Sequence, residues 1–314
     1  MDISYIIVSW NAKDFLLKCL SSIQNDARNF SSEIIVVDNA SSDGSPEMVA
    51  AQFPEVRLIR NKENLGFAKA NNIGIGESRG KYLALINSDV DVLRGCTSLM
   101  LDYIEKHDDI GMLGPQILNL DGSVQRSCMG FPTLWNSFCR ALALDDFFPK
   151  SRFFGSHLMT YWSHNETACV DILIGCFWLI RRQALERVGE LDEKFFFYGE
   201  DWDWCKRFWA GGWKVVYFNE AKSIHYGGAS SAKAPMKFVL ELQRSKFRYW
   251  NKYHRLPSRL AFLFITFFHN LIRFFAEIIR YAVKPNNRRD TSFKIMRASQ
   301  LMRWLLGFDI EKRV

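Results

Sequence analysis

Three carboxylates lie within one of the most aromatic stretches of the chain, FFFYGEDWDWCKRFWAGGW at residues 195–213. These acids are Glu200, Asp201 and Asp203. The pattern predicts a short helix over residues 201–210 that a pair of glycines ends, and acids in a first helical turn are favoured by the helix dipole. The alternative is chemical, because an apolar wall raises the pKa of a nearby carboxyl and suits it to act as a general base.

Two further acidic clusters directly follow β-branched runs. In VVDNASSDGS, Asp38 ends such a run. A carboxylate there can accept the imide N–H of a uracil or thymine ring, and the alternative is an ordinary Asx-rich turn. In LINSDVD, Asp89 and Asp91 follow an apolar run. Hard oxygen ligands at a stiff strand end suit Mg²⁺ or Mn²⁺ carrying a diphosphate, although polar loops of this composition are also common without a metal.

His225 stands in KSIHYGGASS after the apolar run WKVVYFN. A lone histidine is more often structural than functional, but the two glycines that follow would let the backbone approach a ligand closely. A glycine pattern earlier in the chain, GIGESRG at residues 74–80, follows a helical pattern rather than a strand. It therefore lacks the context of a dinucleotide-binding fingerprint, which argues against a Rossmann dehydrogenase.

The elements that must position these residues alternate over about the first 90 residues. Short β-branched runs occur in ISYIIVSW, SEIIVVD, VRLIRN and KYLALIN, and helical patterns such as KDFLLKCLSSIQND separate them. This alternation predicts a mostly parallel α/β sheet wound in βαβ units. Ligands bind beyond the carboxyl ends of the strands in such sheets, and the polar clusters SWN, DNASSDGS and NSDVD all fall there.

Composition bounds the class of protein. With 314 residues, of which 48% are apolar, the chain is long enough for one large domain with an appendage or for two small domains, and global disorder is excluded. Seven scattered cysteines without a CxxC pair predict reduced thiols in a cytoplasmic protein and no structural zinc. The N-terminal MDISYIIVSWN has no basic leader, and its apolar stretch is too short for a secretion signal.

Charge is distributed asymmetrically along the chain. The net charge is +7, but residues 231–314 hold 18 Lys or Arg against 5 Asp or Glu and therefore carry +13. The first 230 residues carry the remaining −6. An acidic body with a basic tail predicts that the tail meets an anionic surface.

Within this tail, LAFLFITFFHNLIRFFAEIIRYAVK at residues 260–284 is an apolar helical pattern with one polar stripe. The stripe consists of His269, Arg273, Glu277, Arg280 and Lys284. The longest uninterrupted apolar run, residues 260–268, has nine residues, whereas a bilayer span needs about 20. We therefore expect a helix that lies in the interface of an anionic membrane. The alternatives are a helix packed on the catalytic domain or on a second subunit, and a nucleic-acid-binding segment.

In their order along the chain, these motifs resemble a family 2 glycosyltransferase of the GT-A fold, and more narrowly its bacterial rhamnosyltransferase-like members. The resemblance rests on IIVSWN, IIVVDNASSDGS, NLGFAKANNIGI, LINSDVD and the long segment from GCFWLIRR to SIHYGGAS. It covers about residues 1–231, with a less specific middle, and implies a GT-A domain there. Residues 232–314 are then a basic helical extension.

The resemblance also implies the catalytic residue. The segment YGEDWDWC matches the Glu-Asp motif of the family, whose aspartate is the catalytic base, here Asp201. At its side, Glu200 would brace the site, and Trp202 would offer a flat surface to a sugar face.

A metal site is implied in the same way. NSDVD matches a metal-binding motif that is usually Asn-Pro-Asp in this subgroup, so Asp89 is the implied ligand of a divalent cation, Mn²⁺ or Mg²⁺. This chain has Ser88 where proline is usual, and the additional Asp91 leaves open which carboxylate contacts the metal. His225 matches a residue that helps to hold the metal or the diphosphate. The positions implied to contact the nucleotide-sugar donor are Ser9, Asn11, Asp38, Asn64, Gly66 and Asn72.

The function implied by the resemblance is inverting, metal-dependent transfer of a sugar in cell-surface polysaccharide synthesis. The donor is dTDP-rhamnose first and a UDP-sugar second, and the acceptor is a saccharide or a lipid-linked saccharide. We expect the enzyme in the cytoplasm, peripheral on the inner face of the plasma membrane, without a nucleic-acid partner and with a homodimer left open. The alternative is a catalytically silent nucleotide-sugar-binding or scaffold protein, against which the intact Asp89, Asp201 and His225 argue.

Overall fold

The computed structural model of the protein describes residues 1–26, 30–227, 235–283 and 288–307. The chain forms two compact units, each built from two stretches of sequence. The first unit comprises Met1–Phe131 and Trp162–Lys233, and the second comprises Pro132–Tyr161 and Ala234–Val314. The predicted domain boundary between residues 231 and 232 lies outside the described residues.

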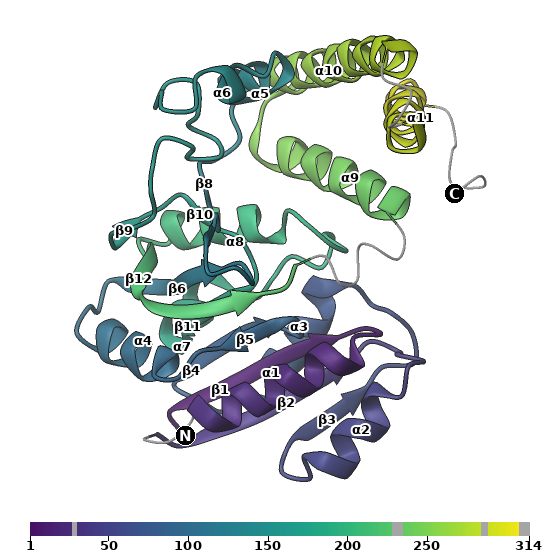
Figure 1. Cartoon of the computed structure of the whole chain (residues 1–314). Helices are drawn as coiled ribbons and strands as arrows, with labels where there is room; N and C mark the ends of the chain where they lie inside the picture. The colour runs from purple at the N-terminus through teal and green to yellow at the C-terminus, as the bar shows by residue number, and fades with distance from the viewer. Residues whose placement is uncertain (27–29, 228–234, 284–287, 308–314) are drawn as a thin grey trace. The chain divides into compact units, whose positions relative to one another are not determined.

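A ten-stranded mixed sheet forms the centre of the first unit (Figure 1). Its first half is parallel, in the order β3-β2-β1-β4, as the alternating pattern predicts. These strands are β1 (Ile3–Ser9), β2 (Ser32–Asp38), β3 (Arg57–Arg60) and β4 (Tyr82–Asn87). The central ones are continuous buried runs because helices cover both faces of the sheet.

The second half of the sheet contains antiparallel strands. In it, β11 runs antiparallel to both β4 and β6, and β12 pairs parallel with β6 and antiparallel with β5. Short strands flank this half, and β8 and β10 pair separately. The bounds are β5 (Val90–Val92), β6 (Ile110–Leu118), β7 (Val124–Gln125), β8 (Cys128–Met129), β9 (Ala168–Cys169), β10 (Ile172–Leu173), β11 (Phe177–Arg181) and β12 (Lys214–His225).

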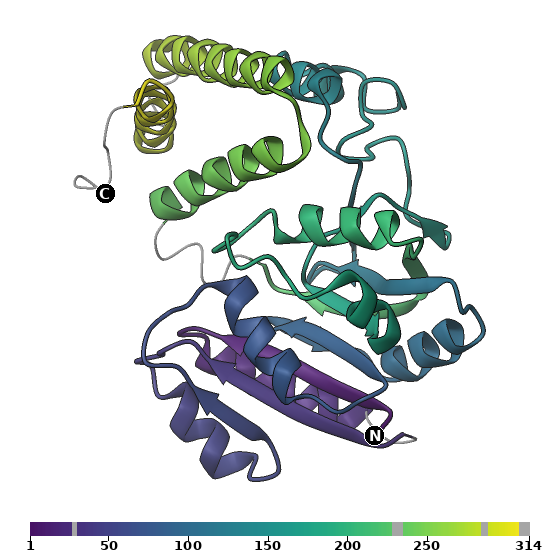
Figure 2. The ribbon, with the colours of Figure 1, turned by 180° about the vertical axis from the view of Figure 1, so that it is seen from behind.

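Alternation along the strands decides which helix covers which face. On β2, Ile34 and Val36 join the main core with α1, α2 and α4, whereas Ile35 and Val37 face α3. Accordingly, α1 lies in front of the sheet in Figure 1 and α3 lies in front of it in the reverse view of Figure 2. The helices of this unit are α1 (Lys13–Asp26), α2 (Ser45–Gln52), α3 (Phe67–Glu77), α4 (Cys96–Glu105), α7 (Arg182–Val188) and α8 (Glu200–Ala210).

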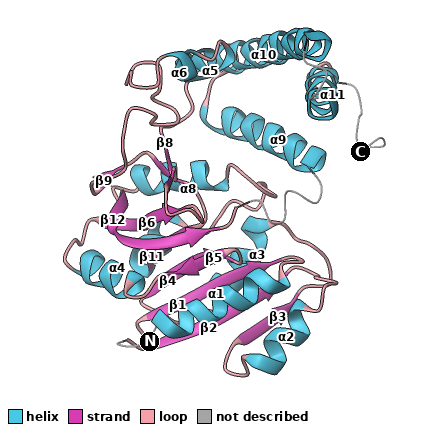
Figure 3. Cartoon of the chain, viewed as in Figure 1, coloured by secondary structure: helices cyan, strands magenta, loops and turns pink. Residues whose placement is uncertain are grey.

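The described part of the second unit contains helices and connecting loops (Figure 3). Aromatic packing holds its long helices together: Trp250 stacks on Phe262 with ring centroids 4.5 Å apart, and Phe247 contacts both Phe262 and Trp304. The helices are α5 (Leu134–Ala141), α6 (Leu144–Phe147), α9 (Pro235–Tyr253), α10 (Leu256–Val283) and α11 (Arg288–Leu305).

The helix α10 differs from the expectation in two respects. It has 28 residues with a window of mean hydropathy 1.6, so by length and composition it is able to cross a membrane, which the nine-residue run had argued against. Of its predicted polar stripe, Glu277 is buried and His269 and Arg273 are half-buried, whereas Arg280 is exposed; apolar side chains on the other side of the helix are exposed as well. Lys284, the last residue of the predicted stripe, lies outside the described residues.

Candidate active site

Parallel pairing aligns the carboxyl ends of three strands at one edge of the sheet. Ser9 of β1 pairs with Asp38 of β2, and Val8 pairs with Asn87 of β4. The turns that follow these strands contain the predicted donor and metal residues, including Asp89 just beyond β4. The topology therefore gathers side chains that are up to 80 residues apart in sequence.

At this edge, only one oxygen of the Asp38 carboxylate accepts a hydrogen bond within the described chain. Its Oδ2 accepts a hydrogen bond from the N–H of Ser41 at 3.0 Å, as an Asx turn requires. Within the described chain its Oδ1 is buried without a hydrogen-bond partner, and so is the hydroxyl of Ser9. Asn11 has a left-handed φ of 52°, and its Oδ1 accepts a hydrogen bond from the N–H of Ser42 at 2.8 Å. This bond joins the turn after β1 to the turn after β2. Because buried polar atoms are rarely left unpaired, Oδ1 of Asp38 marks a place for a donor group of a ligand.

The neighbouring Asn39, which sequence analysis missed, connects this turn to the loop before α3. Its Nδ2 donates to the carbonyl of Gly66 at 3.0 Å and to Oδ1 of Asn64 at 3.2 Å. Gly66 has a φ of 84°, and a Cβ there would lie 2.5 Å from the carbonyl oxygen of Phe196. Only glycine fits, and Gly66 thereby allows the loop before α3 to rest on the aromatic loop before α8.

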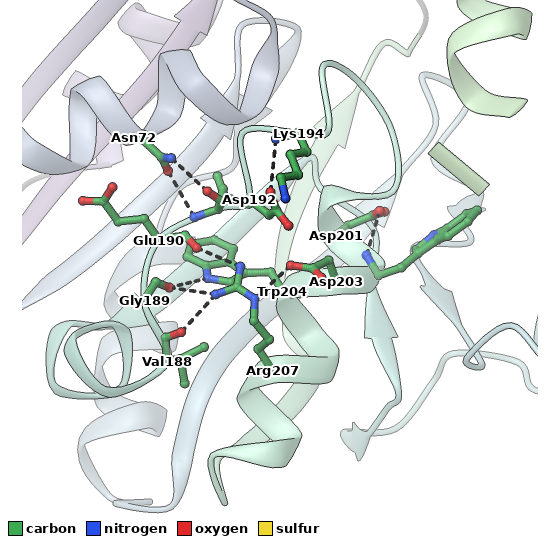
Figure 4. A network of polar contacts seen from close by, with 12 residues as sticks. Asn72, Val188, Gly189, Glu190, Asp192, Lys194, Asp201, Asp203, Trp204 and Arg207 are labelled. Carbon is green, nitrogen blue, oxygen red and sulfur yellow. Dashed lines mark hydrogen bonds and ion pairs between the residues drawn. The ribbon is translucent and has the colours of Figure 1, made fainter. Parts of the chain in front are cut away.

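Asn72 holds the segment that precedes this aromatic loop. Its Nδ2 donates to the carbonyl of Leu191 at 2.9 Å, and its Oδ1 accepts the N–H of the same residue at 3.1 Å (Figure 4). Both ends of the amide thus have backbone partners across 119 residues of sequence. The contact that the resemblance implies between Asn72 and the donor stays a prediction.

Of the three acids in the opening motif, Asp203 is engaged within the protein. It is fully buried, and its Oδ2 pairs with Nε of Arg207 at 2.8 Å. Arg207 also donates to the carbonyls of Val188 and Glu190, at 3.0 and 2.7 Å (Figure 4). The pair therefore fixes α8 to the end of α7 and is a structural element of the site.

Asp201 has a different environment, although it is only 7% exposed. Its Oδ1 accepts the N–H of the next residue, Trp202, at 2.9 Å, which is not a capping bond, because the N-cap of α8 is Gly199. Burial nevertheless raises the pKa of Asp201 to about 6, against backbone hydrogen bonds that lower it. A carboxylate with this pKa is ionised at neutral pH and has a high proton affinity, as a general base requires. Glu200 beside it is also 7% exposed.

The backbone that enters α8 is held in an unusual conformation. Tyr198 has a φ of 67° and Gly199 a φ of 80°, so two successive residues are left-handed. Such a conformation in a tyrosine is strained and is characteristic of functional loops. Among the aromatic neighbours, Phe195 and Trp204 are buried in the core, whereas the half-buried rings of Phe197 and Tyr198 lie 4.5 Å apart.

The predicted metal residues Asp89 and His225 meet directly. Nε2 of His225 lies 3.3 Å from Oδ1 of Asp89, which is 8% exposed. On the opposite side, Nδ1 of His225 lies 2.6 Å from Oε1 of Gln125. The amide of Gln125 is oriented by its Nε2, which donates to Asn119 and to the carbonyl of His225. Sequence analysis missed Gln125 because a two-residue strand in an irregular segment has no pattern.

This orientation fixes the tautomer of His225. Since Oε1 of Gln125 accepts, Nδ1 of a neutral ring holds the proton and Nε2 presents a lone pair to Asp89. Two acceptors then face one another, an arrangement that a cation between or beside them stabilises. An amide that orients a ligating histidine from behind is also the usual second shell of a metal site.

Two protein ligands fit a cation that also binds a diphosphate. Mg²⁺ in such sites takes one or two carboxylates and completes its shell with phosphate oxygens and water. In the described ranges, no three His, Cys, Asp or Glu side chains gather at metal-binding spacing, so Asp91 does not complete a protein-only site. Asp91 lies in β5 opposite Ile224, between two valines that face the core.

The thiol of Cys176 connects the metal residues to the proposed base. Burial raises the pKa of Cys176 to about 12, and the charges of Asp89 and Asp201 both add to this effect. The two carboxylates therefore act on the same buried thiol. In addition, the N–H of Asn87 donates to the carbonyl of Cys176 at 2.9 Å. The fold thus brings the end of β4 and the start of α8 to one place.

The fold and these residues define a GT-A glycosyltransferase, and the sequence comparison gives the family. The model of glycosyl transferase family 2 matches residues 4–189, so the chain belongs to this family. Within it, the chain is of the bacterial rhamnosyltransferase-like kind.

Two curated relatives carry this assignment. The chain is 30% identical over 225 residues to the N-acetylglucosaminyl-diphospho-decaprenol L-rhamnosyltransferase of Mycobacterium tuberculosis, covering 68% of this chain and 73% of the relative. It is 28% identical over 269 residues to rhamnosyltransferase WbbL of Escherichia coli, covering 81% of this chain and 94% of the relative.

Solved structures agree with the fold. The mannosyltransferase PcManGT from Pyrobaculum calidifontis, determined in complex with GDP-Man and Mn²⁺, superposes with a TM-score of 0.56 at 15% identity. That match covers 96% of this chain and 87% of the other. TarS of S. aureus, residues 1–349, superposes with a TM-score of 0.52 at 12% identity, covering 98% and 90% of the two chains.

Proposed function

We propose that this glycosyltransferase moves a sugar, with rhamnose from dTDP-rhamnose as first choice and a UDP-sugar as second, onto a lipid-linked or saccharide acceptor with inversion. The observations that carry the proposal are the direct contact of Asp89 with His225 beyond β4 and the buried carboxylate of Asp201 at the start of α8. A base and a diphosphate-binding site must lie on either side of the anomeric carbon for direct displacement.

The steps follow from these groups. The ionised carboxylate of Asp201 takes the proton of the acceptor hydroxyl as that oxygen bonds to the anomeric carbon. The bond between this carbon and the diphosphate oxygen breaks at the same time, which inverts the configuration. Asp89 and His225 would hold a divalent cation, which supplies Lewis-acid charge for the departing diphosphate. Oδ1 of Asp38 would accept the imide N–H of the nucleobase, which thymine and uracil both provide.

The acceptor and the location come from different observations. The M. tuberculosis relative is named for a lipid diphosphate acceptor, which supports a lipid-linked acceptor for this chain. The basic C-terminal region and the exposed apolar side of α10 support peripheral attachment to the inner face of the plasma membrane. The catalytic unit would thereby work at the surface where its acceptor is held.

A donor panel tests the proposal. Full-length protein with Mn²⁺ is incubated with dTDP-rhamnose, UDP-sugars and GDP-mannose, and nucleotide diphosphate release is measured with and without a lipid-linked acceptor. We expect the fastest release from dTDP-rhamnose. Release from another donor alone would overturn the rhamnose assignment. Binding of nucleotide sugars without turnover would overturn the enzyme and favour the silent scaffold protein.

A further inference from the structure

Cationic side chains of four helices gather in the second unit. They come from α5, α9, α10 and α11, which contact one another in this unit. Burial, together with the charges of Arg140 and Arg297, lowers the pKa of Lys246. Burial lowers the pKa of His269 to about 4, and Arg273 and Lys246 add to this effect. Like charges repel at such spacing, so the arrangement is unfavourable unless something else is bound.

Around these cations, buried polar atoms lack hydrogen-bond partners among the described residues. Gln243, one helical turn before Lys246 on α9, is 6% exposed, and among the described residues its Nε2 has no hydrogen-bond partner. In the same part of the chain, Nδ1 of His269 is buried and unpaired. Lys246, Arg273 and Arg297 form no hydrogen bond or ion pair with any described residue. Native proteins seldom leave such groups unpaired.

Carboxylates of the second unit neutralise only part of this charge. Arg140 pairs with Asp145 at 2.8 Å and with Asp146 at 3.1 Å, both on α6. On α9, Glu241 accepts from Arg248 and from Arg244, and on α10, Glu277 pairs with Arg280. Arg140 is therefore the one member of the cluster with a carboxylate partner among the described residues.

Opposite the cluster, α10 presents an exposed apolar face. This face consists of Leu260, Phe264, Phe268, Ile272, Phe275 and Ile279, which are 42–65% exposed. His269 and Arg273 share the inward side of the helix with the buried Thr266 and Asn270. Figures 1 and 2 both show α5 beside one end of α10. The apolar face of an interfacial helix lies about 5–10 Å deep in the boundary between headgroups and acyl chains. Since a helix is about 10 Å wide, the side of α10 that faces the protein would lie near the depth of the lipid phosphates.

We propose that the cationic cluster binds the phosphate group of an anionic membrane lipid while the apolar face of α10 lies among the acyl chains. The guanidinium groups of Arg273 and Arg297 suit bidentate contact with phosphate oxygens, and the ammonium of Lys246 supplies a point charge. Nε2 of Gln243 donates to a remaining oxygen. This inference rests on the membrane attachment proposed above and gives it a specific headgroup site.

The test compares two lysines of α9 in the full-length protein. Lys246 belongs to the cluster, whereas Lys252 is an exposed residue of the same helix. Binding of wild-type protein, Lys246→Gln and Lys252→Gln is measured on vesicles of phosphatidylcholine with and without phosphatidylglycerol. General attraction predicts a loss of about fivefold for either change. The site predicts a further loss of about tenfold for Lys246→Gln alone, because a charge-assisted hydrogen bond is lost.

Two further readouts separate the alternatives. Without lipid, Lys246→Gln should melt at the same temperature as the wild type or above it, because the change removes a charge that its neighbours repel. A lower melting temperature would show that Lys246 has a stabilising partner within the protein, which would contradict the proposal. Equal losses of vesicle binding for the two variants would overturn the site. Inorganic phosphate is titrated in parallel, and saturation at micromolar concentration without dependence on the vesicle headgroup would assign the site to a free phosphate and overturn the lipid.

The outcome is independent of the sugar chemistry. Nucleotide diphosphate release by the wild-type protein is measured in the same preparations. Wild-type protein that binds vesicles through Lys246 but releases no nucleotide diphosphate would contradict the proposed transfer and support the lipid site. Release without selective vesicle binding would support the transfer and overturn the lipid site.

Discussion

Nε2 of His225 faces Oδ1 of Asp89 at 3.3 Å, and Gln125 holds the opposite ring nitrogen at 2.6 Å. The sequence separation is 136 residues for the first pair and 100 for the second. Because Gln125 fixes the proton on Nδ1, it determines that the free lone pair points at the carboxylate. Gln125 thereby sets which ring nitrogen of His225 faces Asp89.

Gln125→Leu should therefore weaken Mn²⁺-dependent binding of a nucleotide diphosphate by about 10-fold or more, the usual effect of losing an outer-shell partner. Isothermal titration of UDP or dTDP with and without Mn²⁺ measures this change. Gln125→Glu still accepts from Nδ1 and should retain most of the affinity. Equal Mn²⁺-dependent affinity for Gln125→Leu and the wild type would remove Gln125 from the site.

Removal of the metal should abolish transfer reversibly. EDTA should stop nucleotide diphosphate release, and an excess of Mn²⁺ or Mg²⁺ should restore it. Asp89→Asn should weaken the Mn²⁺-dependent part of nucleotide binding more than Asp91→Asn, because Asp89 is the carboxylate that lies 3.3 Å from Nε2 of His225. Full activity in chelator would contradict the metal role, and a larger effect at Asp91 would reverse the assignment of the two carboxylates.

A matched pair of glycines tests the join between the loops before α3 and α8. Gly66→Ala places a Cβ 2.5 Å from the carbonyl oxygen of Phe196 at a left-handed φ, so it should destabilise the protein by more than 1 kcal/mol and weaken donor binding. Gly76→Ala lies in α3 with no heavy atom within 4 Å and should stabilise by about 0.5–1 kcal/mol. Thermal unfolding measures both; equal melting temperatures would contradict the close approach at Gly66.

Local pattern was sufficient for much of the fold and part of the site. The predicted first helix, KDFLLKCLSSIQND, coincides with α1 because Leu16, Leu20 and Ile23 recur at helical spacing and all are buried. The strand ends carrying Asp38 and Asp89 were also predictable, since alternating strands and helices make parallel pairing the simplest solution. The meeting of Asp89 with His225 was implied only by the family resemblance.

The sequence pattern does not predict the features that depend on contacts between distant segments of the chain. The polar stripe of α10 was visible in the sequence, but periodicity does not state which side of a helix faces the protein, and here Glu277 is buried whereas Arg280 is exposed. The nine-residue apolar run underestimated the length of the apolar helix, because single polar residues interrupt the apolar sequence of the 28-residue α10. Likewise, residues 132–161 join the second unit through α5, which contacts α10, and no local signal encodes that partnership.

The structural acid of the opening motif predicts a stability effect. Asp203→Asn removes the negative charge that pairs with Arg207, and because Asp203 is fully buried and Arg207 is only 22% exposed, the guanidinium loses its counter-charge in a largely desolvated place. The free energy of unfolding should fall by about 3 kcal/mol or more, measured by urea denaturation at pH 7. Asp203→Asn protein as stable as the wild type would show that the pair does not fix α8 to α7.

Asp201→Asn should have the opposite profile, with lost turnover and retained or increased stability. The variant is nearly isosteric but unable to take the acceptor proton, so turnover should fall by about 100-fold or more while donor binding survives.

Burial holds the pKa of Asp201 at about 6, above the ordinary 3.8, so the native state binds more protons than the unfolded state between these values. The contribution of Asp201 to stability therefore falls as pH rises from about 4 to 6, and at pH 7 the ionised group costs at most about 3 kcal/mol. Asparagine removes that cost, so the variant should melt at or above the wild-type temperature at pH 7. Wild-type turnover should rise as pH increases through about 6, because the base must be ionised. A near wild-type rate in Asp201→Asn would leave this carboxylate with the role of a first-turn acid at the positive end of α8.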